Sequence, residues 1–387
     1  MRKDWEYKKL GEVCTIERGG SPRPITDFIT NDSNGINWIK IGDTKERSKY
    51  ITSTKEKIKP EGVKKSRFVH KGDFILSNSM SFGRPYILDI DGCIHDGWLV
   101  IHDGKKFFSK DYLYYLLASP IMYSRFSQLA VGGVVNNLNS ALVRKVIVPI
   151  PPISIQLSIA NELDKINELI QLKKQQLKDY DQLAQSIFYE MFGDPVENEK
   201  GWEVKKLGEV CETSSGGTPS KTHTEYYENG TIPWLRSGEV SQGYIYDAEI
   251  YISELGLNKS SAKIFPKDTV LIAMYGATVG EVGILCNPMC TNQAICGILP
   301  NDLYNSEFLR YVLLSHKDKY LSLASGGAQP NISQQIIKST LIPFIDKPLQ
   351  QQFAARIEAI ERQKQQVSET IKDLETLLAS RMQYWFD

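Results

Sequence analysis

Two stretches of the chain carry a seven-residue repeat of hydrophobic positions. Residues 157–192 and 351–386 lack Gly and Pro and are rich in Leu, Gln, Lys and Glu. Apolar side chains fill fifteen of the eighteen a and d positions, a pattern typical of a coiled coil, so each stretch is predicted to be one long helix. The apolar seam positions include Leu163, Ile166, Ile170, Leu177, Tyr180 and Ile187 in the first stretch, and Ile357, Ile360, Val367, Ile371, Leu374 and Leu378 in the second.

Three cationic residues, Lys173, Lys364 and Arg381, interrupt this seam. Charged residues at such positions can fix the register of two helices at a cost in stability. Alternatively, their aliphatic stems line the edge of the seam while the charges reach water. The sequence leaves both interpretations open. The two helices are predicted to pair with each other as an antiparallel coiled coil.

The rest of the chain is a duplication. The segment WEYKKLGEVC at 5–14 recurs as WEVKKLGEVC at 202–211, and further matches follow in the same order at an offset of 194 to 197 residues. They pair Gly19–Pro22 with Gly216–Pro219, Ile36–Asp43 with Ile232–Glu239, Tyr112–Leu117 with Phe308–Leu313, Pro149 with Pro343 and Gln156 with Gln350. Between these matches the copies diverge, which suggests two sites of the same kind with different targets.

A period near 195 residues is far longer than that of a solenoid, so each copy is predicted to be a domain followed by a helix. Within the copies, strands are predicted at 38–41, 74–76, 270–273 and 295–299, and helices at 111–119 and 306–315. The predicted fold class is α+β, with strand-rich mixed domains. The predicted segments are a first globular domain (1–152), a spacer helix (153–193), a second globular domain (194–345) and a C-terminal spacer helix (346–387).

Charge is distributed unevenly along the chain, although the net formal charge is zero. Residues 1–152 carry 24 Lys and Arg against 16 Asp and Glu, a net of +8. Residues 194–345 carry 12 against 17, a net of −5. The first domain could therefore attract phosphate through its general field, whereas the second would need a local patch.

Patterns that signal a membrane, a metal or a catalytic centre are missing from the sequence. No run of about 20 apolar residues occurs, and the N-terminus lacks the apolar core of a signal peptide, so a cytoplasmic protein is expected. The six Cys form no CxxC pair and no His lies near the trio at 286–296, so no metal site is expected. No Walker A, HExxH, GxSxG or Asn-Pro-Pro-Tyr motif occurs. His95 and Asp96 could form an acid/base pair, but neighbours on a strand point to opposite faces.

The ordered set of repeated motifs resembles the specificity (S) subunits of Type I restriction–modification systems. The set comprises W-x-x-K-K-L-G-E-V, the loop G-G-[ST]-P, the strand W-[IL]-[KR]-x-G-[DE], a late Gly-Gly…Asn segment, a Pro-containing phrase and a long helix, and it covers essentially the whole chain twice. The family often has Glu-Gln after the Pro-containing phrase. Here Ile155-Gln156 and Leu349-Gln350 keep the Gln without the Glu, which affects only the expected details of helix entry.

This resemblance implies a non-catalytic, DNA-binding subunit. Each target-recognition domain would read one half of a bipartite double-stranded DNA target, and the paired helices would set the gap between the halves. The helices would also hold two methyltransferase (M) subunits, which carry S-adenosylmethionine and methylate adenine. Restriction (R) subunits that use ATP and Mg would then join, and no membrane is involved. No cofactor is expected in this chain.

Other functions remain open on the residues alone. The chain could be the S subunit of a related system, such as a Type IIB-like system or one that only methylates, and neighbouring genes would separate these. It could also be a duplicated coiled-coil scaffold that binds proteins only, or an enzyme with an unrecognised site. The polar, amide-rich loops beside the repeated motifs and the basic excess of the first domain favour DNA.

Loops next to the repeated motifs hold the candidate DNA-binding residues, because Arg, Lys, Asn, Gln, Ser and Thr contact bases and phosphates. Lys40 and Arg236 are the first choices, since they follow matched Trp residues that should be core residues (Trp38 and Trp234). The matched Gly pairs should permit a positive φ or a close approach to the DNA backbone. The candidates are Ser21, Arg23, Lys40, Lys45, Arg47, Asn78, Ser79, Arg84, Asn136 and Asn137 in the first copy, and Thr218, Ser220, Lys221, Arg236, Ser237, Tyr275, Asn292, Gln293, Gln329 and Asn331 in the second.

Overall fold

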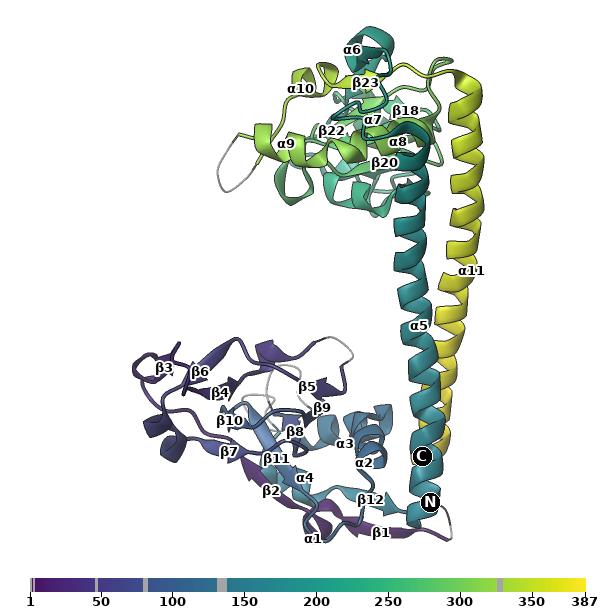
Figure 1. Ribbon diagram of the computed structural model, residues 1–387. Coiled ribbons are helices and arrows are strands. Elements are labelled where there is room, and N and C mark those ends of the chain that lie inside the picture. Colours follow the sequence, from purple (N-terminus) through teal and green to yellow (C-terminus); the bar gives the residue numbers. More distant parts are fainter. Residues whose placement is uncertain (1, 3, 46–47, 79–82, 131–137, 326–329) are drawn as a thin grey trace. The chain divides into compact units, whose positions relative to one another are not determined.

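The computed structural model describes the chain except residues 1, 3, 46–47, 79–82, 131–137 and 326–329. By internal contacts the chain divides into two units, residues 1–174 with 369–387, and residues 175–368 (Figure 1). Each unit therefore contains one globular domain together with part of both long helices, α5 (Ile153–Phe192) and α11 (Lys347–Phe386). The four segments expected from the sequence remain a prediction.

The globular part of the first unit consists mostly of short strands, with three of its short helices grouped between β11 and β12. Its strands are β1 (Glu6–Lys9), β2 (Thr15–Arg18), β3 (Ile29–Thr30), β4 (Ile36–Ile39), β5 (Tyr50–Ile51), β6 (Glu56–Ile58), β7 (Arg67–Val69), β8 (Phe74–Ser77), β9 (Pro85–Leu88), β10 (Gly92–Ile94), β11 (Trp98–His102) and β12 (Ile147–Ile150). Its short helices are α1 (Leu10–Val13), α2 (Lys110–Ala118), α3 (Pro120–Ala130) and α4 (Ser140–Lys145), with 3₁₀ turns η1 (Ile25–Asp27), η2 (Ile41–Asp43) and η3 (Pro60–Lys65).

The second unit repeats this order of elements. Its strands are β13 (Val204–Lys206), β14 (Thr213–Ser215), β15 (Ile232–Leu235), β16 (Tyr244–Ile245), β17 (Tyr251–Ile252), β18 (Ile264–Phe265), β19 (Val270–Ala273), β20 (Val282–Leu285), β21 (Met289–Thr291), β22 (Ile295–Ile298) and β23 (Leu341–Pro343). Its short helices are α6 (Leu207–Val210), α7 (Glu254–Asn258), α8 (Ser306–Ser315), α9 (Lys317–Leu323) and α10 (Gln334–Lys338), with turns η4 (Thr224–Tyr226), η5 (Ser237–Gln242) and η6 (Gly276–Thr278).

Sheet topology confirms that the sequence repeat is a repeat of fold. In the first unit the strand orders are β3-β6-β4-β10-β7 and β2-β11-β8-β9-β5. In the second they are β17-β15-β21-β18 and β14-β22-β19-β20-β16, which is the same arrangement without a counterpart of β3 among the described residues. The matched Trp residues keep one register, because Trp38 lies beside Cys93 and Trp234 beside Cys290 on parallel neighbours. The predicted α+β class is confirmed.

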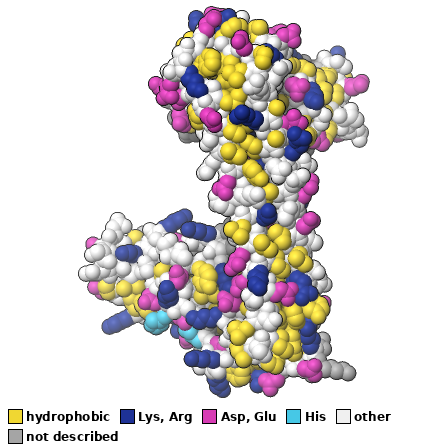
Figure 2. All heavy atoms as spheres, turned by 45° about the vertical axis from the view of Figure 1, so that its right-hand side comes forward, with side chains coloured by type: hydrophobic (Ala, Val, Ile, Leu, Met, Phe, Trp, Pro, Cys, Tyr) yellow, Lys and Arg dark blue, Asp and Glu magenta, His cyan; other side chains and the backbone are white. Residues whose placement is uncertain are grey.

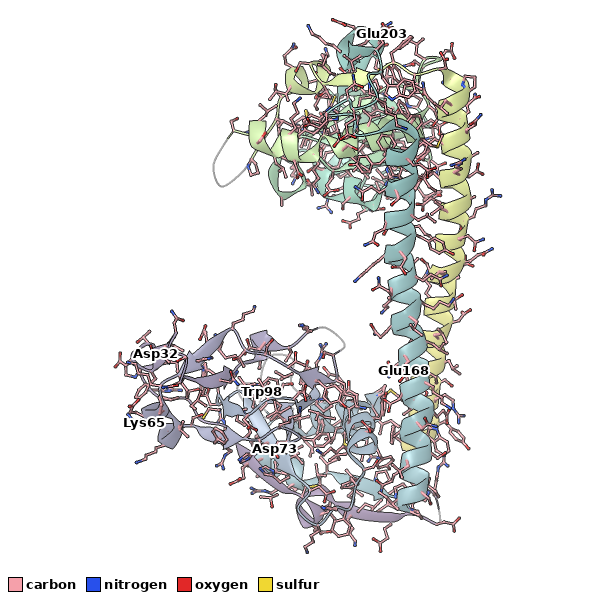
Figure 3. All side chains as sticks on the ribbon, in the orientation of Figure 1. Asp32, Lys65, Asp73, Trp98, Glu168 and Glu203 are labelled. Atoms are coloured by element: carbon pink, nitrogen blue, oxygen red, sulfur yellow. The ribbon has the colours of Figure 1, made fainter. Side chains whose placement is uncertain are left out.

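The first domain has one core between its two larger sheets and a larger one between the sheet that contains β8 and the helices. Ile39 and Ile94 from one sheet pack against Ile75 and Trp98 from the other, and all four are essentially inaccessible to water. Trp98 lies inside the domain while Asp32 and Lys65 lie at its outer end (Figure 3). The Trp98 Nε1–H donates to the Ile39 carbonyl at 3.2 Å, so this buried polar group is satisfied and links the two sheets.

The long helices pair in antiparallel orientation, as predicted (Figure 1). In the first unit Glu162 pairs with Arg381, and further along α5 Lys174 pairs with Glu375 at 3.0 Å. In the second unit Asp181 pairs with Lys364 at 2.8 Å. Two of the three cations that interrupt the seam thus bind carboxylates of the facing helix, which supports their role in fixing register.

The seam departs from the heptad pattern near the end of α5. Phe188 and Phe192 are each 1% exposed, whereas the predicted seam residues Ile187 and Met191 are half-buried. Phe192 contacts Phe308 of α8 with ring centroids 4.8 Å apart. The buried face rotates here because α5 meets α8 as well as its partner helix, so one-partner heptad geometry no longer decides which side chains are covered.

A buried glutamine joins the start of each long helix to its domain. Gln156 is 1% exposed; its amide donates to the carbonyls of Phe107 and Pro151, and its Oε1 accepts from the Ser109 amide at 2.8 Å. Gln350 makes the same three bonds at the matched position, to Leu303, Ile345 and Asn305. Because Ser109 and Asn305 are the N-caps of α2 and α8, the glutamine links the start of each long helix to the start of the short helix, which accounts for the Gln that both copies keep.

Candidate nucleic-acid interface

Each globular domain carries a loop cavity at the same place in its fold, where the G-G-[ST]-P loop meets the end of the Trp-bearing strand. The first loop cavity is lined by Ser21, Pro22, Arg23, Ile25, Thr26, Ile29, Trp38, Lys40, Glu56, His95 and Asp96. The second loop cavity is lined by Lys221, Thr224, Tyr227, Glu228, Trp234, Arg236 and Ile250. Several residues expected to contact DNA are brought together in these two places.

The matched Trp residues form part of both cavity walls but belong to the core. Trp38 is 2% exposed and Trp234 is 3% exposed. The Trp234 Nε1–H donates to the Gly217 carbonyl at 2.9 Å, which ties the G-G-[ST]-P loop to the strand. This confirms the expectation that these residues brace the strand.

The two leading candidates, Lys40 and Arg236, are already paired with carboxylates. Lys40 Nζ lies 2.5 Å from Glu56 of β6, and Arg236 pairs with Glu249 just before β17. Sequence matching missed both carboxylates because they stand on segments of low similarity. About half of the Arg236 side chain is exposed, so its guanidinium can still exchange this partner for a phosphate or a base.

A carboxylate three residues after each cation fixes the local backbone. The Lys40 amide donates to Asp43 at 2.8 Å, and the Arg236 amide donates to Glu239 at 2.9 Å. Each acid is the third residue of a 3₁₀ turn that starts directly after the cation, and this turn is why the strand predicted at 38–41 ends at Ile39. Lys40 and Arg236 therefore project from the first residue beyond the strand in both copies.

The matched Gly pairs serve a purpose different from the one expected. None of the four has a positive φ in the described chain. Instead, a Cβ on Gly19 would lie 2.2 Å from the His95 carbonyl oxygen, and one on Gly216 would lie 2.1 Å from the Thr291 side chain. The close approach is thus to the protein's own β10–β11 and β21–β22 turns. In the first copy Gly19 N–H donates to the Trp98 carbonyl at 2.9 Å, and the second copy repeats this bond.

This contact places the loop hydroxyl against the turn in both copies. Ser21 Oγ donates to Asp96 Oδ1 at 2.8 Å, and Thr218 Oγ1 donates to Gln293 Oε1. Asp96 and Gln293 stand at the same position, two residues beyond the end of β10 and of β21. The loops differ in sequence but share this bond.

His95 and Asp96 do not form an acid/base pair. The assumption that they lie on a strand was wrong, since β10 ends at Ile94 and β11 begins at Trp98. His95 Nδ1 accepts from the Gly97 amide at 2.7 Å and lies 3.7 Å from Asp96 Oδ1, beyond hydrogen-bond reach. Burial lowers the pKa of His95, so it is uncharged at neutral pH.

The remaining candidates in the first copy are dispersed. Asn78 is 1% exposed and its amide donates to the Asp96 carbonyl at 2.9 Å, so it supports the turn from within. Lys45 lies in a different groove, described below, and Arg84 is exposed outside the first loop cavity. Arg47, Ser79, Asn136, Asn137 and Gln329 of the second copy lie outside the described residues.

In the second copy the candidates form two groups. Lys221 and Arg236 line the second loop cavity, whereas Thr218 and Gln293 are bonded to each other and are not part of its lining. Tyr275 is 45% exposed and pairs through its backbone with Asn331. Asn292 Oδ1 accepts from the Ala294 amide at 3.1 Å, which makes it a turn-stabilising residue. Ser220 bonds Thr222 at 2.8 Å, and Ser237 begins η5.

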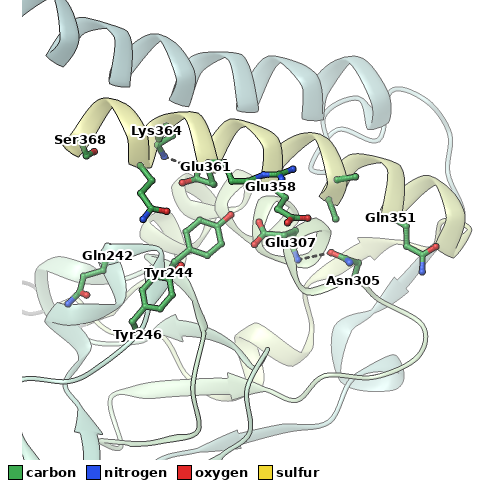
Figure 4. Close-up of a pocket in the computed structure, with 14 residues that line it drawn as sticks. Gln242, Tyr244, Tyr246, Asn305, Glu307, Gln351, Glu358, Glu361, Lys364 and Ser368 are labelled. Carbon is green, nitrogen blue, oxygen red and sulfur yellow. Dashed lines mark hydrogen bonds and ion pairs between the residues drawn. The ribbon is translucent and has the colours of Figure 1, made fainter. Parts of the chain in front are cut away.

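A second matched feature, here called the junction groove, lies where each domain meets its long helix. In the first unit it runs between β5, α2 and α5, and Lys49 there binds Asp111 and Asp164. In the second unit it runs between β16, α8 and α11 (Figure 4). The residues that line the second junction groove include Gln242, Tyr244, Tyr246, Glu307, Glu358, Glu361 and Arg362.

The cation of the junction groove has moved between the copies. The position of Lys49 is Gly243 in the second copy, where a Cβ would lie 2.7 Å from Arg310 Nη2. Arg310 of α8 occupies that space and faces Glu307 at 3.9 Å. Burial raises the pKa of Glu307, although Arg310 opposes this shift.

Surface charge on the first domain agrees with its composition. On the face drawn in Figure 2, Lys and Arg side chains are spread over this domain with Asp and Glu between them. Among the described residues, no helix combines the length and the apolar character needed to span a membrane. Five of the six cysteine thiols are buried and Cys286 is partly so.

Comparisons with known proteins all find members of one protein family. A family model described as the Type I restriction modification DNA specificity domain matches residues 2–179 and again residues 199–376. The specificity subunit of the Type I restriction enzyme MjaIX of Methanocaldococcus jannaschii is 25% identical over 382 residues, which cover 92% of this chain and 87% of that protein.

Two solved structures share the fold. A chain from a study of complex assembly and conformational transition of the Type I restriction–modification system superposes with a TM-score of 0.66 at 21% identity, over 99% of this chain and 97% of that one. The S subunit of a Type I system from M. genitalium gives a TM-score of 0.52 at 15% identity, over 99% and 96%. With its matching domain present twice, the chain belongs to the Type I restriction–modification DNA specificity family and is a specificity subunit.

Proposed function

We propose that this specificity subunit reads a bipartite DNA sequence, with one loop cavity for each half. The proposal rests on one observation: the two domains share the same structural residues around the cavity but differ in the polar side chains there. Both cavities are lined by a core Trp and by a cation just beyond the strand that is paired with a carboxylate, and in both domains a hydroxyl of the Gly-Gly loop bonds to the turn. The polar side chains around these shared residues differ, as two readers of different sequences require.

The cations supply affinity and the turns supply selectivity. Lys40 and Arg236 would contact phosphates or base edges after leaving their carboxylate partners. Those partners hold each cation in place before DNA arrives, and they also reduce its attraction for DNA. The chain itself performs no chemistry in this proposal, and its DNA target implies a cytoplasmic location.

Methyltransferase subunits would dock on the long helices. Leu169, Leu172, Leu183 and Leu377 are each at least 45% exposed on α5 and α11, outside the seam between them. Exposed apolar side chains of this kind are suited to further helix packing. Two methyltransferase subunits would bring S-adenosylmethionine, and restriction subunits would bring ATP and Mg.

Methylation of the native host's genome tests this function. N6-methyladenine is mapped in the strain with the gene intact and in one with the gene deleted. The proposal expects a motif of two short sequences, separated by a gap of fixed length, that is methylated only in the intact strain. Identical methylation in the two strains would contradict it and favour a scaffold that binds proteins only.

A further inference from the structure

One hydrogen bond between the Gly-Gly loop and the neighbouring turn is common to the two domains, but its acceptor differs in chemistry. Ser21 donates to the carboxylate of Asp96, and Thr218 donates to the amide oxygen of Gln293. The hydroxyl is carried by the same loop in each copy, and the acceptor by the same turn. A fixed donor therefore orients a side chain whose type has diverged.

The orientation of Asp96 is determined by several contacts. Its backbone carbonyl accepts from Asn78 at 2.9 Å and from Arg18 at 3.0 Å. Its second carboxylate oxygen faces Arg23 at 3.3 Å, and that Arg side chain is 82% exposed. Arg23 can exchange this contact for a phosphate without any change in the turn, which would open one face of the carboxylate.

Asp96 is charged at neutral pH. Partial burial raises its pKa, but the Ser21 hydroxyl, its own backbone amide, His95 and Arg18 together lower it below the ordinary value. An ionised carboxylate accepts hydrogen bonds and donates none. Its side chain is 39% exposed, so it remains accessible to a ligand.

We propose that Asp96 and Gln293 are the matched base-reading side chains of the two domains, an inference that rests on the proposed function. Asp96 accepts a hydrogen bond from the exocyclic amino group of a base, and cytosine N4 is the preferred donor to a carboxylate. Gln293 is exposed and keeps its amide N–H groups and one oxygen lone pair, which suit the N7 and N6 edge of adenine. Ser21 and Thr218 are positioning residues that orient these two side chains.

Selection from random DNA tests this proposal. The complex is recovered from its native host through a tag on the full-length chain and mixed with duplexes of randomised sequence, and the bound duplexes are sequenced. Asp96→Asn should reduce the preference for cytosine at one position of one half on the order of tenfold. Gln293→Glu should shift one position of the other half from adenine toward cytosine. In each variant the unaltered half serves as an internal control for folding.

A charge-matched control separates contact from field effects. Glu12→Gln removes a carboxylate on α1, where Glu12 accepts from the Lys9 amide at 3.2 Å, away from the first loop cavity. It should leave every base preference unchanged.

Four results would be contrary. A split motif whose base preferences are the same in both variants would overturn the inference and leave the proposed function standing. A uniform change of affinity, or the same change in Glu12→Gln, would also overturn it. Failure of the unaltered complex to select any common sequence would overturn the proposed function and the inference together.

Discussion

The two domains solve one structural problem with different residues. In the first junction groove Lys49 reaches from the β5 side to Asp111 and Asp164. In the second, Gly243 replaces that lysine and Arg310 fills the space from α8. The charge is kept while its point of attachment moves, which shows that the groove requires a cation at this place rather than a particular sequence.

The loops around the two loop cavities show the opposite kind of difference: the positions are kept and the chemistry of one residue changes. There the attachment points are constant, with a cation beyond the strand and a hydroxyl on the Gly-Gly loop, while the acceptor on the turn changes from Asp96 to Gln293. At positions that only support the fold, the cation can come from a different residue in each copy as long as the groove keeps its positive charge. At positions proposed to contact DNA, the surrounding cation and hydroxyl are kept while one side chain differs.

The largest expected effect separates the seam from the exposed face of the same helix. Ile170→Asp places a charge at a position that is 3% exposed and should lower the free energy of unfolding by roughly 3 kcal/mol or more. Leu172→Asp, at a position that is 66% exposed, should change it little. Chemical denaturation of both variants measures the difference, and equal effects would contradict the pairing of the helices.

Close packing of the Gly-Gly loop predicts the next effect. Gly19→Ala places a Cβ 2.2 Å from the His95 carbonyl oxygen, so the loop must shift, at a cost of about 1–3 kcal/mol. The variant should lose selectivity in one half of the motif and keep the other. Gly42→Ala is the control, because nothing lies within 4 Å of its Cβ. Loss of both halves would indicate general unfolding instead.

Substitutions of the two members of the Arg236–Glu249 ion pair are expected to have opposite effects on DNA binding. Arg236→Ala should weaken DNA binding by about 1–2 kcal/mol and leave association with the methyltransferase subunits intact. Glu249→Gln should strengthen DNA binding, since it releases Arg236 from its ion pair. Titration of DNA at several salt concentrations measures both. Weaker binding in Glu249→Gln would mean that the carboxylate is needed to position the cation.

The smallest expected effect concerns the second junction groove. Because the folded-state pKa of Glu307 is raised, its contribution to stability decreases as pH rises above the unfolded value near 4.5. Glu307→Gln should therefore stabilise the protein at pH 7 by on the order of 1 kcal/mol, and the gain should vanish at lower pH. Glu358→Gln removes the same charge from an exposed position in the same groove and serves as the control, with little expected effect on stability. Thermal unfolding across this pH range distinguishes the two.

The duplication, the long helices and the matched cations could be predicted because each leaves a local or periodic pattern. The partners of those cations could not, because Glu56 and Glu249 become neighbours only when β6 and β17 pair with the Trp-bearing strands. Phe188 was missed because α5 contacts α8, which no heptad encodes. Asp96 was set aside as a strand residue, although it lies in a turn.

Independent reading by the two domains is the central claim, and cavity-specific variants test it most directly. One variant carries Ser21→Ala with Lys40→Ala, and the other carries Thr218→Val with Arg236→Ala. N6-methyladenine is mapped in the native host for each. The account predicts that each variant relaxes one half of the bipartite motif, a different half in the two cases, and leaves the other half intact. Relaxation of the same half in both, or of both halves in either, would contradict it.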